Sequence, residues 1–365
     1  MKALFIINIP SPYRLKFFEQ LGAQCDLTVL FERASSSERD GSWKDIEFKN
    51  YRGIVLKSVR VGVDMALAPS VKKYLKDKYD FIFVADFLSP TGMLATRYLR
   101  RHKIPYALES DGGFAGTDSG IKKKIKTMAM SGAAAYFSTG KAHDAYYQRY
   151  GADPARIVRY PFSSVTADKV LDTPVSAEEK QALRRRLGIT ENRVLLYVGQ
   201  FIHRKGIDIL LRAYAKCKNA DGLYLIGGTA TDEYLQLVDE LQLKNVHFIG
   251  FTAPDEIAAY YKAADVFVLP TRYDIWGLVV NEAMAYGLPV ITSNTCLAGL
   301  EMVENEKTGA LFECENVDEL SGAIDAVMSG KTEETAAACL RTARRYTIET
   351  MVEQHTEYMR ACRHG

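Results

Sequence analysis

The stretch from Thr271 to Ile291 constrains the fold more than any other part of the chain. It follows an apolar run, 266–269, that is typical of a buried strand, and it ends in a second such run. Between the two runs, Gly277 is placed to begin a helix and Gly287 to end it. A helix between two buried strands predicts a parallel sheet, whose ligands bind outside the carboxyl ends of the strands.

The helix predicted within this stretch is apolar on nearly every side, and Glu282 is a rare polar interruption. A carboxylate on a buried helix costs roughly 3–5 kcal/mol if its partner is missing, so a base, a backbone donor or a ligand hydroxyl must satisfy it. Asp274 lies in the preceding loop, and the free amides at the start of the helix suit a phosphate. Two carboxylates for hydroxyls and amides for an anion match a sugar attached to a nucleoside diphosphate.

A second informative block spans residues 194–206. A predicted buried strand runs into Gly199 and Gln200, and Arg204 and Lys205 then precede a helix. Two cations beside a helix N-terminus can hold a diphosphate. The alternative is a pair of cations on the surface.

Both blocks resemble the donor site of the retaining family-4 glycosyltransferases of GT-B fold. In that family, two glutamates flank a Gly-Leu-Val core, and Ala-Met-Ala-x-Gly-Leu-Pro-Val follows the second. Here Asp274 stands at the place of the first glutamate and Glu282 at the place of the second. Lys205 matches the family lysine, whereas Gln200 stands where an arginine is common, so we expect Arg204 to supply that charge.

The likeness covers residues 190–330 well and the first half of the chain in outline. It implies a catalytic role for Asp274 and a place for the base near the strand 246–251. A buried helix with an incidental glutamate is the alternative. No metal or cofactor is expected, since the two cations and the helix amides can offset the charge of the leaving group. The donor-binding residues that the resemblance implies are Arg204, Lys205, Gly199, Gln200, Phe251, Ile275, Trp276, Gly277, Leu278, Val279 and Glu282.

The first half of the chain offers a second set of candidates. Glu109 and Asp111, with two glycines, follow a predicted buried strand, where acids and glycines favour a site. By loose alignment with the family, Asp111 falls where a histidine contacts the donor sugar, so both acids are candidate catalytic residues; a capped turn is the alternative. Tyr13 and Arg14 begin a predicted helix with a Pro-Tyr-Arg start that recurs in the family. They are candidates for the acceptor side, with a surface arginine as the alternative.

Charge is unevenly distributed along the chain. Residues 1–165 carry 26 Lys+Arg and 16 Asp+Glu, a net charge of +10, and the remainder carries −8. Within the first half, residues 119–128 predict an amphipathic helix in which Ile121, Ile125 and Met128 form one stripe. Each lysine near an anionic membrane adds about 1 kcal/mol to binding, so a membrane contact is one interpretation and a solvated face packed on its own domain is the other. The lysines of this helix are Lys122, Lys123, Lys124 and Lys126.

Alternating strand and helix patterns predict the α/β class with GT-B architecture, in which two Rossmann-like doubly wound domains face a cleft and the C-terminal helix crosses back. No run reaches the roughly eighteen apolar residues of a transmembrane helix. The six scattered cysteines show no metal spacing and fit a reducing cytosol. The first strand lacks the glycine fingerprint of dinucleotide-binding proteins, and the polar segment 32–45 predicts a loop. The predicted limits are 1–165 for the acceptor domain, 166–189 for a linker and lead-in helix, 190–345 for the nucleotide-sugar domain and 346–365 for the last helix.

The chain is thus predicted to be a hexosyltransferase-type enzyme. We expect it to move a sugar from a nucleotide-diphosphate-sugar donor to a glycan or lipid-linked acceptor with retention, in cell-surface polysaccharide or glycolipid biosynthesis. The expected location is the cytoplasm or the inner face of the membrane, with no nucleic acid as partner. Two alternatives stay open: a GT-B-fold nucleotide-sugar epimerase, and a non-catalytic nucleotide-sugar-binding protein, which the aspartate at position 274 makes conceivable.

Overall fold

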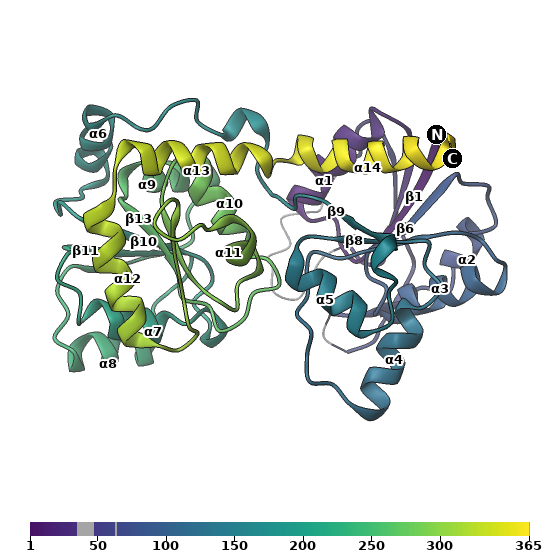
Figure 1. Cartoon of the computed structure of the whole chain (residues 1–365), viewed down its shortest axis with the longest axis horizontal. Coiled ribbons are helices and arrows are strands. Elements are labelled where there is room, and N and C mark those ends of the chain that lie inside the picture. Colours follow the sequence, from purple (N-terminus) through teal and green to yellow (C-terminus); the bar gives the residue numbers. More distant parts are fainter. Residues whose placement is uncertain (35–46, 63, 365) are drawn as a thin grey trace. The chain divides into compact units, whose positions relative to one another are not determined.

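A computed structural model of the chain describes residues 1–34, 47–62 and 64–364. The chain forms two compact units (Figure 1): unit 1 comprises Met1–Ser164 with Ile348–Gly365, and unit 2 comprises Val165–Thr347. Each unit has a parallel sheet with helices, which confirms the predicted α/β class with two Rossmann-like domains. The loop predicted at 32–45 lies outside the described residues from position 35 onward.

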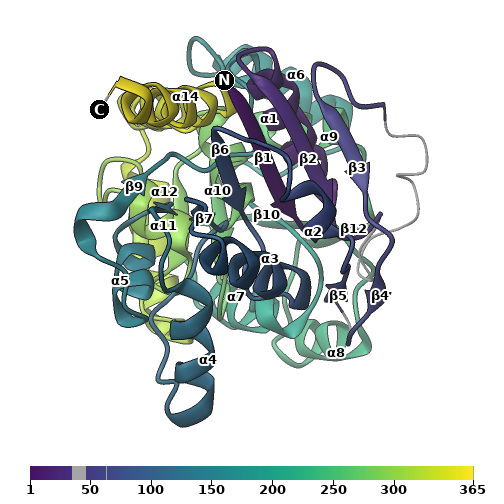
Figure 2. The same cartoon turned by 90° about the vertical axis from the view of Figure 1, so that its right-hand side faces the viewer.

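Among the described residues, unit 1 contains a seven-stranded parallel sheet, and several of its strands can be seen side by side in Figure 2. A separate antiparallel pair, β4 (Val59–Arg60) and β5 (Ala66–Leu67), lies after the third strand in the chain. The order of strands across the main sheet is β3 (Arg52–Val55), β2 (Asp26–Phe31), β1 (Lys2–Ile7), β6 (Phe81–Val84), β7 (Ala107–Glu109), β8 (Ala135–Ser138) and β9 (Ile157–Arg159).

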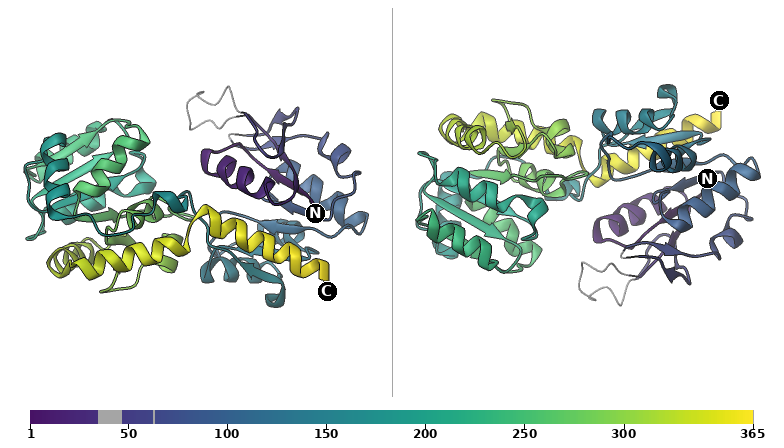
Figure 3. Two further views of the ribbon diagram at one scale, coloured as in Figure 1. Left: turned by 90° about the horizontal axis from the view of Figure 1, so that it is seen from above. Right: turned by 90° about the horizontal axis from the view of Figure 1, so that it is seen from below.

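Successive side chains of a strand point to opposite faces of the sheet, and the apolar side chains of these strands need cover on both faces. Helices provide that cover on each face. On the face of Phe5 and Phe83, α1 (Pro12–Gly22) packs against α14 (Ile348–His364), and the ring of Phe17 contacts that of His355. Figure 3 shows α14 in yellow lying along unit 1. The opposite face is covered by α2 (Val71–Tyr74), α3 (Pro90–Arg101), α4 (Gly120–Met130) and α5 (Lys141–Arg149).

Unit 2 contains a six-stranded parallel sheet. Its order is β12 (Val246–Ile249), β11 (Gly222–Ile226), β10 (Val194–Val198), β13 (Val266–Leu269), β14 (Val290–Ser293) and β15 (Gly309–Phe312). Because β10 and β13 are parallel neighbours, the two loops that carry the sequence blocks emerge at one edge of the sheet. The helices are α6 (Ala177–Leu187), α7 (Ile207–Tyr214), α8 (Asp232–Glu240), α9 (Pro254–Ala263), α10 (Leu278–Ala285), α11 (Leu297–Met302), α12 (Val317–Gly330) and α13 (Glu333–Arg345).

Two glycines allow the loops at this edge to approach one another closely. Gly206, which precedes α7, has φ +72°, and a Cβ there would lie 2.0 Å from the carbonyl oxygen of Pro270. Gly277, which precedes α10, has φ +103°, and a Cβ there would lie 2.7 Å from Cys296 Sγ. Both helices therefore begin where only glycine fits, and the predicted start of α10 is confirmed.

Gly206→Ala should destabilise unit 2 much more than the matched variant Gly188→Ala. Both glycines have a left-handed backbone, with φ of +72° and +70°, but nothing lies within 4 Å of a Cβ at position 188. The left-handed conformation alone costs a residue with a Cβ about 1–2 kcal/mol, and Gly206→Ala adds the clash with Pro270. Urea unfolding of the two variants measures the difference, and equal losses of stability would contradict the close approach of these loops.

Candidate functional site

The loops after β10 and β13 bring the predicted cations of unit 2 to the predicted acid. Lys205 Nζ lies 2.5 Å from Asp274 Oδ2, and Arg204 Nη1 lies 3.9 Å from the same oxygen. Arg204 also donates a hydrogen bond of 2.8 Å to the carbonyl oxygen of Tyr273. The side chain of Arg204 is 42% exposed, against 14% for Lys205. The Asp274 carboxylate thus pairs with Lys205 and lies near Arg204, and Arg204 is the more exposed of the two cations.

Arg272 holds the cation loop in place, a role that was not predicted from the sequence. Its backbone N–H donates to the carbonyl oxygen of Arg204, and its guanidinium donates to that of His203, both at 2.8 Å. Two further bonds of 2.8 Å join the guanidinium to both carboxylate oxygens of Asp208, at the start of α7. Thr271 Oγ1 adds a bond of 3.0 Å to the carbonyl oxygen of Arg204. The position of the predicted cations therefore depends on the loop that also carries the predicted acid.

The start of α10 lies in the same loop. Leu278 and Val279 are half-buried at the first turn of the helix, where backbone N–H groups are free of intrahelical bonds. Trp276 is 2% exposed, and its indole N–H donates to Asn281 Oδ1 at 2.7 Å. The ring packs inside unit 2, and the expected place of Trp276 in the donor site stays a prediction.

Glu282 lies further along α10 and is half-buried. The hydroxyl of Tyr261, on α9, donates to Glu282 Oε2 at 3.3 Å. Burial, followed by the charge of Glu282, raises the pKa of Tyr261, so this hydroxyl stays a donor. One partner of the helix carboxylate within unit 2 is therefore a tyrosine, and the expected contact of Glu282 with a ribose stays a prediction.

Other predicted donor-binding residues lie along the same edge without forming one cluster. Gly199 and Gln200 directly follow β10, and Ile275 is 42% exposed beside Asp274. Phe251 follows β12, at the far side of the sheet, and is 94% exposed. Ile275, an exposed apolar side chain next to the charged Asp274, suits a ligand that has both a ring and a charge. Among the described residues, no group of three or more His, Cys, Asp or Glu side chains could hold a metal ion.

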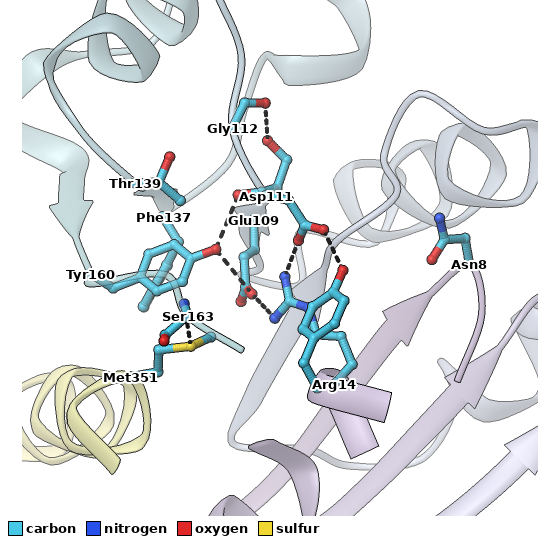
Figure 4. Close-up of polar contacts among 12 residues, drawn as sticks. Asn8, Arg14, Glu109, Asp111, Gly112, Phe137, Thr139, Tyr160, Ser163 and Met351 are labelled. Carbon is cyan, nitrogen blue, oxygen red and sulfur yellow. Dashed lines mark hydrogen bonds and ion pairs between the residues drawn. The ribbon is translucent and has the colours of Figure 1, made fainter. Parts of the chain in front are cut away.

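In unit 1, the predicted acceptor-side and catalytic residues form one buried network around Arg14 (Figure 4). The guanidinium donates to Glu109 Oε1 and to Asp111 Oδ1, both at 2.5 Å. The hydroxyl of Tyr13 donates to Asp111 Oδ2 at 2.8 Å. Arg14 is 1% exposed, so the alternative of a surface arginine is wrong. The Asp111 side chain is 30% exposed and is the part of this network that a ligand can reach.

Glu109 is fully buried, and both of its oxygens are bonded. Oε1 accepts from Arg14, and Oε2 lies 3.0 Å from Nε2 of His355, on α14. His355 Nδ1 lies 2.7 Å from the carbonyl oxygen of Met351, so both ring nitrogens have a polar partner. Burial opposes ionisation of Glu109, but Arg14 and His355 outweigh it and lower its pKa to about 2. Glu109 is therefore an internal anion that fixes Arg14 and α14, and its expected catalytic role stays a prediction.

Comparison with known proteins finds similarity to glycosyltransferases. Residues 179–346 match the family glycosyl transferases group 1. An uncharacterized glycosyltransferase of Methanocaldococcus jannaschii is 27% identical over 305 residues, which are 78% of this chain and 77% of that protein. A D-inositol 3-phosphate glycosyltransferase of Rhodococcus erythropolis is 30% identical over 220 residues, which are 56% of this chain and 48% of that relative. The family model thus matches somewhat less than half of the chain, and the similarity falls mainly on unit 2.

Solved structures confirm the fold of the chain. HepE of Anabaena, crystallised in complex with UDP, has a TM-score of 0.80 and 20% identity, with 99% of this chain and 100% of that chain covered. A sucrose-phosphate synthase of Thermosynechococcus elongatus has a TM-score of 0.77 and 20% identity, with 99% of each chain covered. These neighbours are GT-B glycosyltransferases, and at this identity they establish the fold alone.

The ion pairs of Glu109 should make the stability of unit 1 depend on pH in acid. Because its pKa is about 2 in the folded protein and near 4.5 in an unfolded chain, the stabilisation is complete above pH 4.5 and is lost as the pH falls toward 2. The loss is on the order of 3 kcal/mol.

Urea unfolding at a series of pH values tests this expectation. Glu109→Gln should flatten the dependence of the unfolding free energy on pH, whereas Glu353→Gln, at an exposed position on α14, should leave it unchanged. An identical acid response in wild type and Glu109→Gln would show that this carboxylate is not the anion we describe.

Proposed function

We propose that this protein transfers a sugar from a nucleotide-diphosphate-sugar to an acceptor hydroxyl. The observation that carries the proposal is the meeting of Arg204, Lys205 and Asp274 beside the first turn of α10. Two cations and free helix amides suit a diphosphate, and a carboxylate beside them suits the hydroxyls of a sugar. The family match and the UDP and UDP-glucose complexes of HepE support a donor of this class.

The ion pair between Lys205 and Asp274 suggests how donor binding prepares the reaction. The diphosphate replaces the carboxylate as the partner of Lys205, and Asp274 then turns to the sugar. During transfer, the bond from the anomeric carbon to the diphosphate breaks, a bond to the acceptor oxygen forms, and the proton of the acceptor hydroxyl passes to the released diphosphate. The cations stabilise the charge on the departing diphosphate, and Asp274 stabilises the positive charge that develops on the sugar.

Three finer features belong to this proposal. Retention of configuration rests on the resemblance of the motif around Asp274 and Glu282 to the retaining family, and NMR of the product anomer tests it. Asp111, the exposed end of the network in unit 1, is proposed to contact substrate. We propose catalysis without a metal, because Arg204 and Lys205 carry the charge that a metal would otherwise supply. The comparisons do not favour an epimerase or a non-catalytic binding protein.

We further propose that unit 1 docks on an anionic membrane surface through α4, which projects from the unit (Figure 2). Ile121 and Met128 are 78% and 51% exposed, so the apolar stripe of this helix does not pack on its own unit. Lys122, Lys123 and Lys124 are exposed beside it, while Lys126 is half-buried and pairs with Asp118 at 2.5 Å, so the docking surface that we propose rests on the first three lysines. An apolar stripe with flanking cations suits a lipid surface, and hence an acceptor linked to lipid.

In the part of the chain that the structure describes, no helix is both long enough and apolar enough to span a bilayer.

Asp274→Asn should change donor affinity and turnover in opposite directions. Removing the carboxylate frees Lys205, so a nucleoside diphosphate such as UDP should bind about tenfold more tightly, or ~1.4 kcal/mol. Turnover should fall about 100-fold because the developing charge loses its partner. Calorimetry and donor consumption measure the two effects, with Asp318→Asn as a control that breaks an exposed pair with Lys216. Full activity in Asp274→Asn would reject a catalytic role for this aspartate.

Replacing Lys122, Lys123 and Lys124 with glutamine should weaken binding to vesicles that contain anionic lipid about 100-fold, at about 1 kcal/mol for each lysine. Cosedimentation with vesicles of phosphatidylglycerol and phosphatidylcholine measures this loss, and vesicles of phosphatidylcholine alone should bind neither protein. The matched control replaces Lys72, Lys73 and Lys76, which are exposed near α2. Equal losses in the two triple variants would reject α4 as the docking surface.

A further inference from the structure

A second group of charged side chains lies at the carboxyl edge of the sheet in unit 1, where β2 ends. Glu32 and Arg33 directly follow this strand, and Asp86 follows β6, with β1 between the two strands. The backbone N–H groups of Glu32 and Arg33 donate to the carbonyl oxygens of Ile7 and Asn8, both at 2.9 Å. These bonds continue the sheet and fix both residues at its edge. None of these charged residues belongs to the network around Arg14.

Ser89 forms a short hydrogen bond with Glu32, which a protonated glutamate can donate. Ser89 Oγ lies 2.5 Å from Glu32 Oε1 and 2.9 Å from the carbonyl oxygen of Asp86, and it accepts from the N–H of Gly92 at 2.9 Å. A hydroxyl has one proton to donate. If that proton goes to Asp86, the proton between Ser89 and Glu32 must come from the glutamate. Burial and then the charge of Asp86 raise the pKa of Glu32 to about 8, which agrees with a neutral carboxylic acid.

One acceptor and one donor remain unused on these consecutive residues. Glu32 Oε2 and Arg33 Nε are buried and have no hydrogen-bond partner among the described residues. Glu32 is 0% exposed and Arg33 is 8% exposed, although Arg33 Nη1 is paired with Asp64 at 3.1 Å. A buried polar atom without a partner costs about 1–3 kcal/mol, and in native proteins it usually indicates a bound water or a ligand group. The two residues therefore offer a ligand both an acceptor, Glu32 Oε2, and a donor, Arg33 Nε, whereas a cluster of acids would offer acceptors alone.

We propose that Glu32 and Arg33 form a subsite for a hydroxyl group of the acceptor saccharide. A hydroxyl both donates and accepts, so one hydroxyl, or two neighbouring hydroxyls of a sugar ring, can satisfy Glu32 Oε2 and Arg33 Nε together. An ionised phosphate would serve Arg33 but would bring no proton to Glu32. The pair therefore selects a neutral sugar at this point of the acceptor. This inference rests on the proposed glycosyl transfer and specifies its acceptor side.

Saturation-transfer NMR of the full chain with methyl α-glucoside, methyl α-mannoside and methyl β-galactoside, and with their 6-phosphates, tests the subsite. Wild type should bind at least one of the glycosides, and more tightly than its phosphate. Glu32→Ala and Arg33→Lys should weaken that binding at least tenfold. Glu32→Gln should retain it, because the amide keeps the free carbonyl oxygen and can still donate to Ser89. Arg159→Lys, at an exposed pair with Asp144, is the control for an arginine change.

Two results would overturn the subsite. The first is no binding of any glycoside by wild type, which would mean that a buried water satisfies the two atoms. The second is unchanged binding in Glu32→Ala. UDP affinity, measured by calorimetry on the same samples, separates this outcome from a failure of the proposed function. It should be equal in all variants if unit 2 binds the donor, and absent in all of them if the proposed donor site is wrong.

Discussion

Parallel pairing of β10 with β13 is the constraint on which the candidate site of unit 2 depends. Parallel neighbours end at the same edge, so residues about seventy positions apart in the chain, such as Lys205 and Asp274, come within 2.5 Å of each other. The approach is closer than most side chains would permit, and glycine at positions 206 and 277 makes it possible. Arg272, in the loop after β13, then joins the two loops through the carbonyl oxygen of His203 and the carboxylate of Asp208, both after β10.

Charge balance is arranged differently at the edges of the two sheets. In unit 2, a single carboxylate faces two partly accessible cations and leaves one positive charge unbalanced among these three groups, so an incoming anion can take its place. In unit 1, Arg14 is enclosed by Glu109 and Asp111, and breaking a buried pair of this kind costs about 3–5 kcal/mol. We therefore expect Arg204 and Lys205 to exchange partners during the reaction. Arg14 and Glu109, in contrast, should stay paired and hold α14 against the rest of unit 1.

Long, strongly patterned elements could be predicted from the sequence, and side-chain partners could not. The apolar run and the flanking glycines predicted α10 with its limits, whereas β3 and β9, with four and three residues, are too short to carry a pattern. Trp276 stands within the motif, but its size and apolar ring are equally typical of a packed side chain, and the structure buries it. The fixing roles of Arg272 and His355 arise only from tertiary contacts, so spacing along the chain gave no sign of them.

The central claim is that unit 2 recognises a diphosphate at the edge where Arg204, Lys205 and α10 meet. Calorimetric titration of the wild-type protein with UDP, GDP and ADP, each compared with its nucleoside at low and at high salt, tests it most directly. We predict that at least one nucleoside diphosphate binds 100-fold or more tightly than its nucleoside, and that this advantage shrinks as salt screens the cations. Equal affinity of nucleosides and diphosphates at both salt concentrations would contradict the claim.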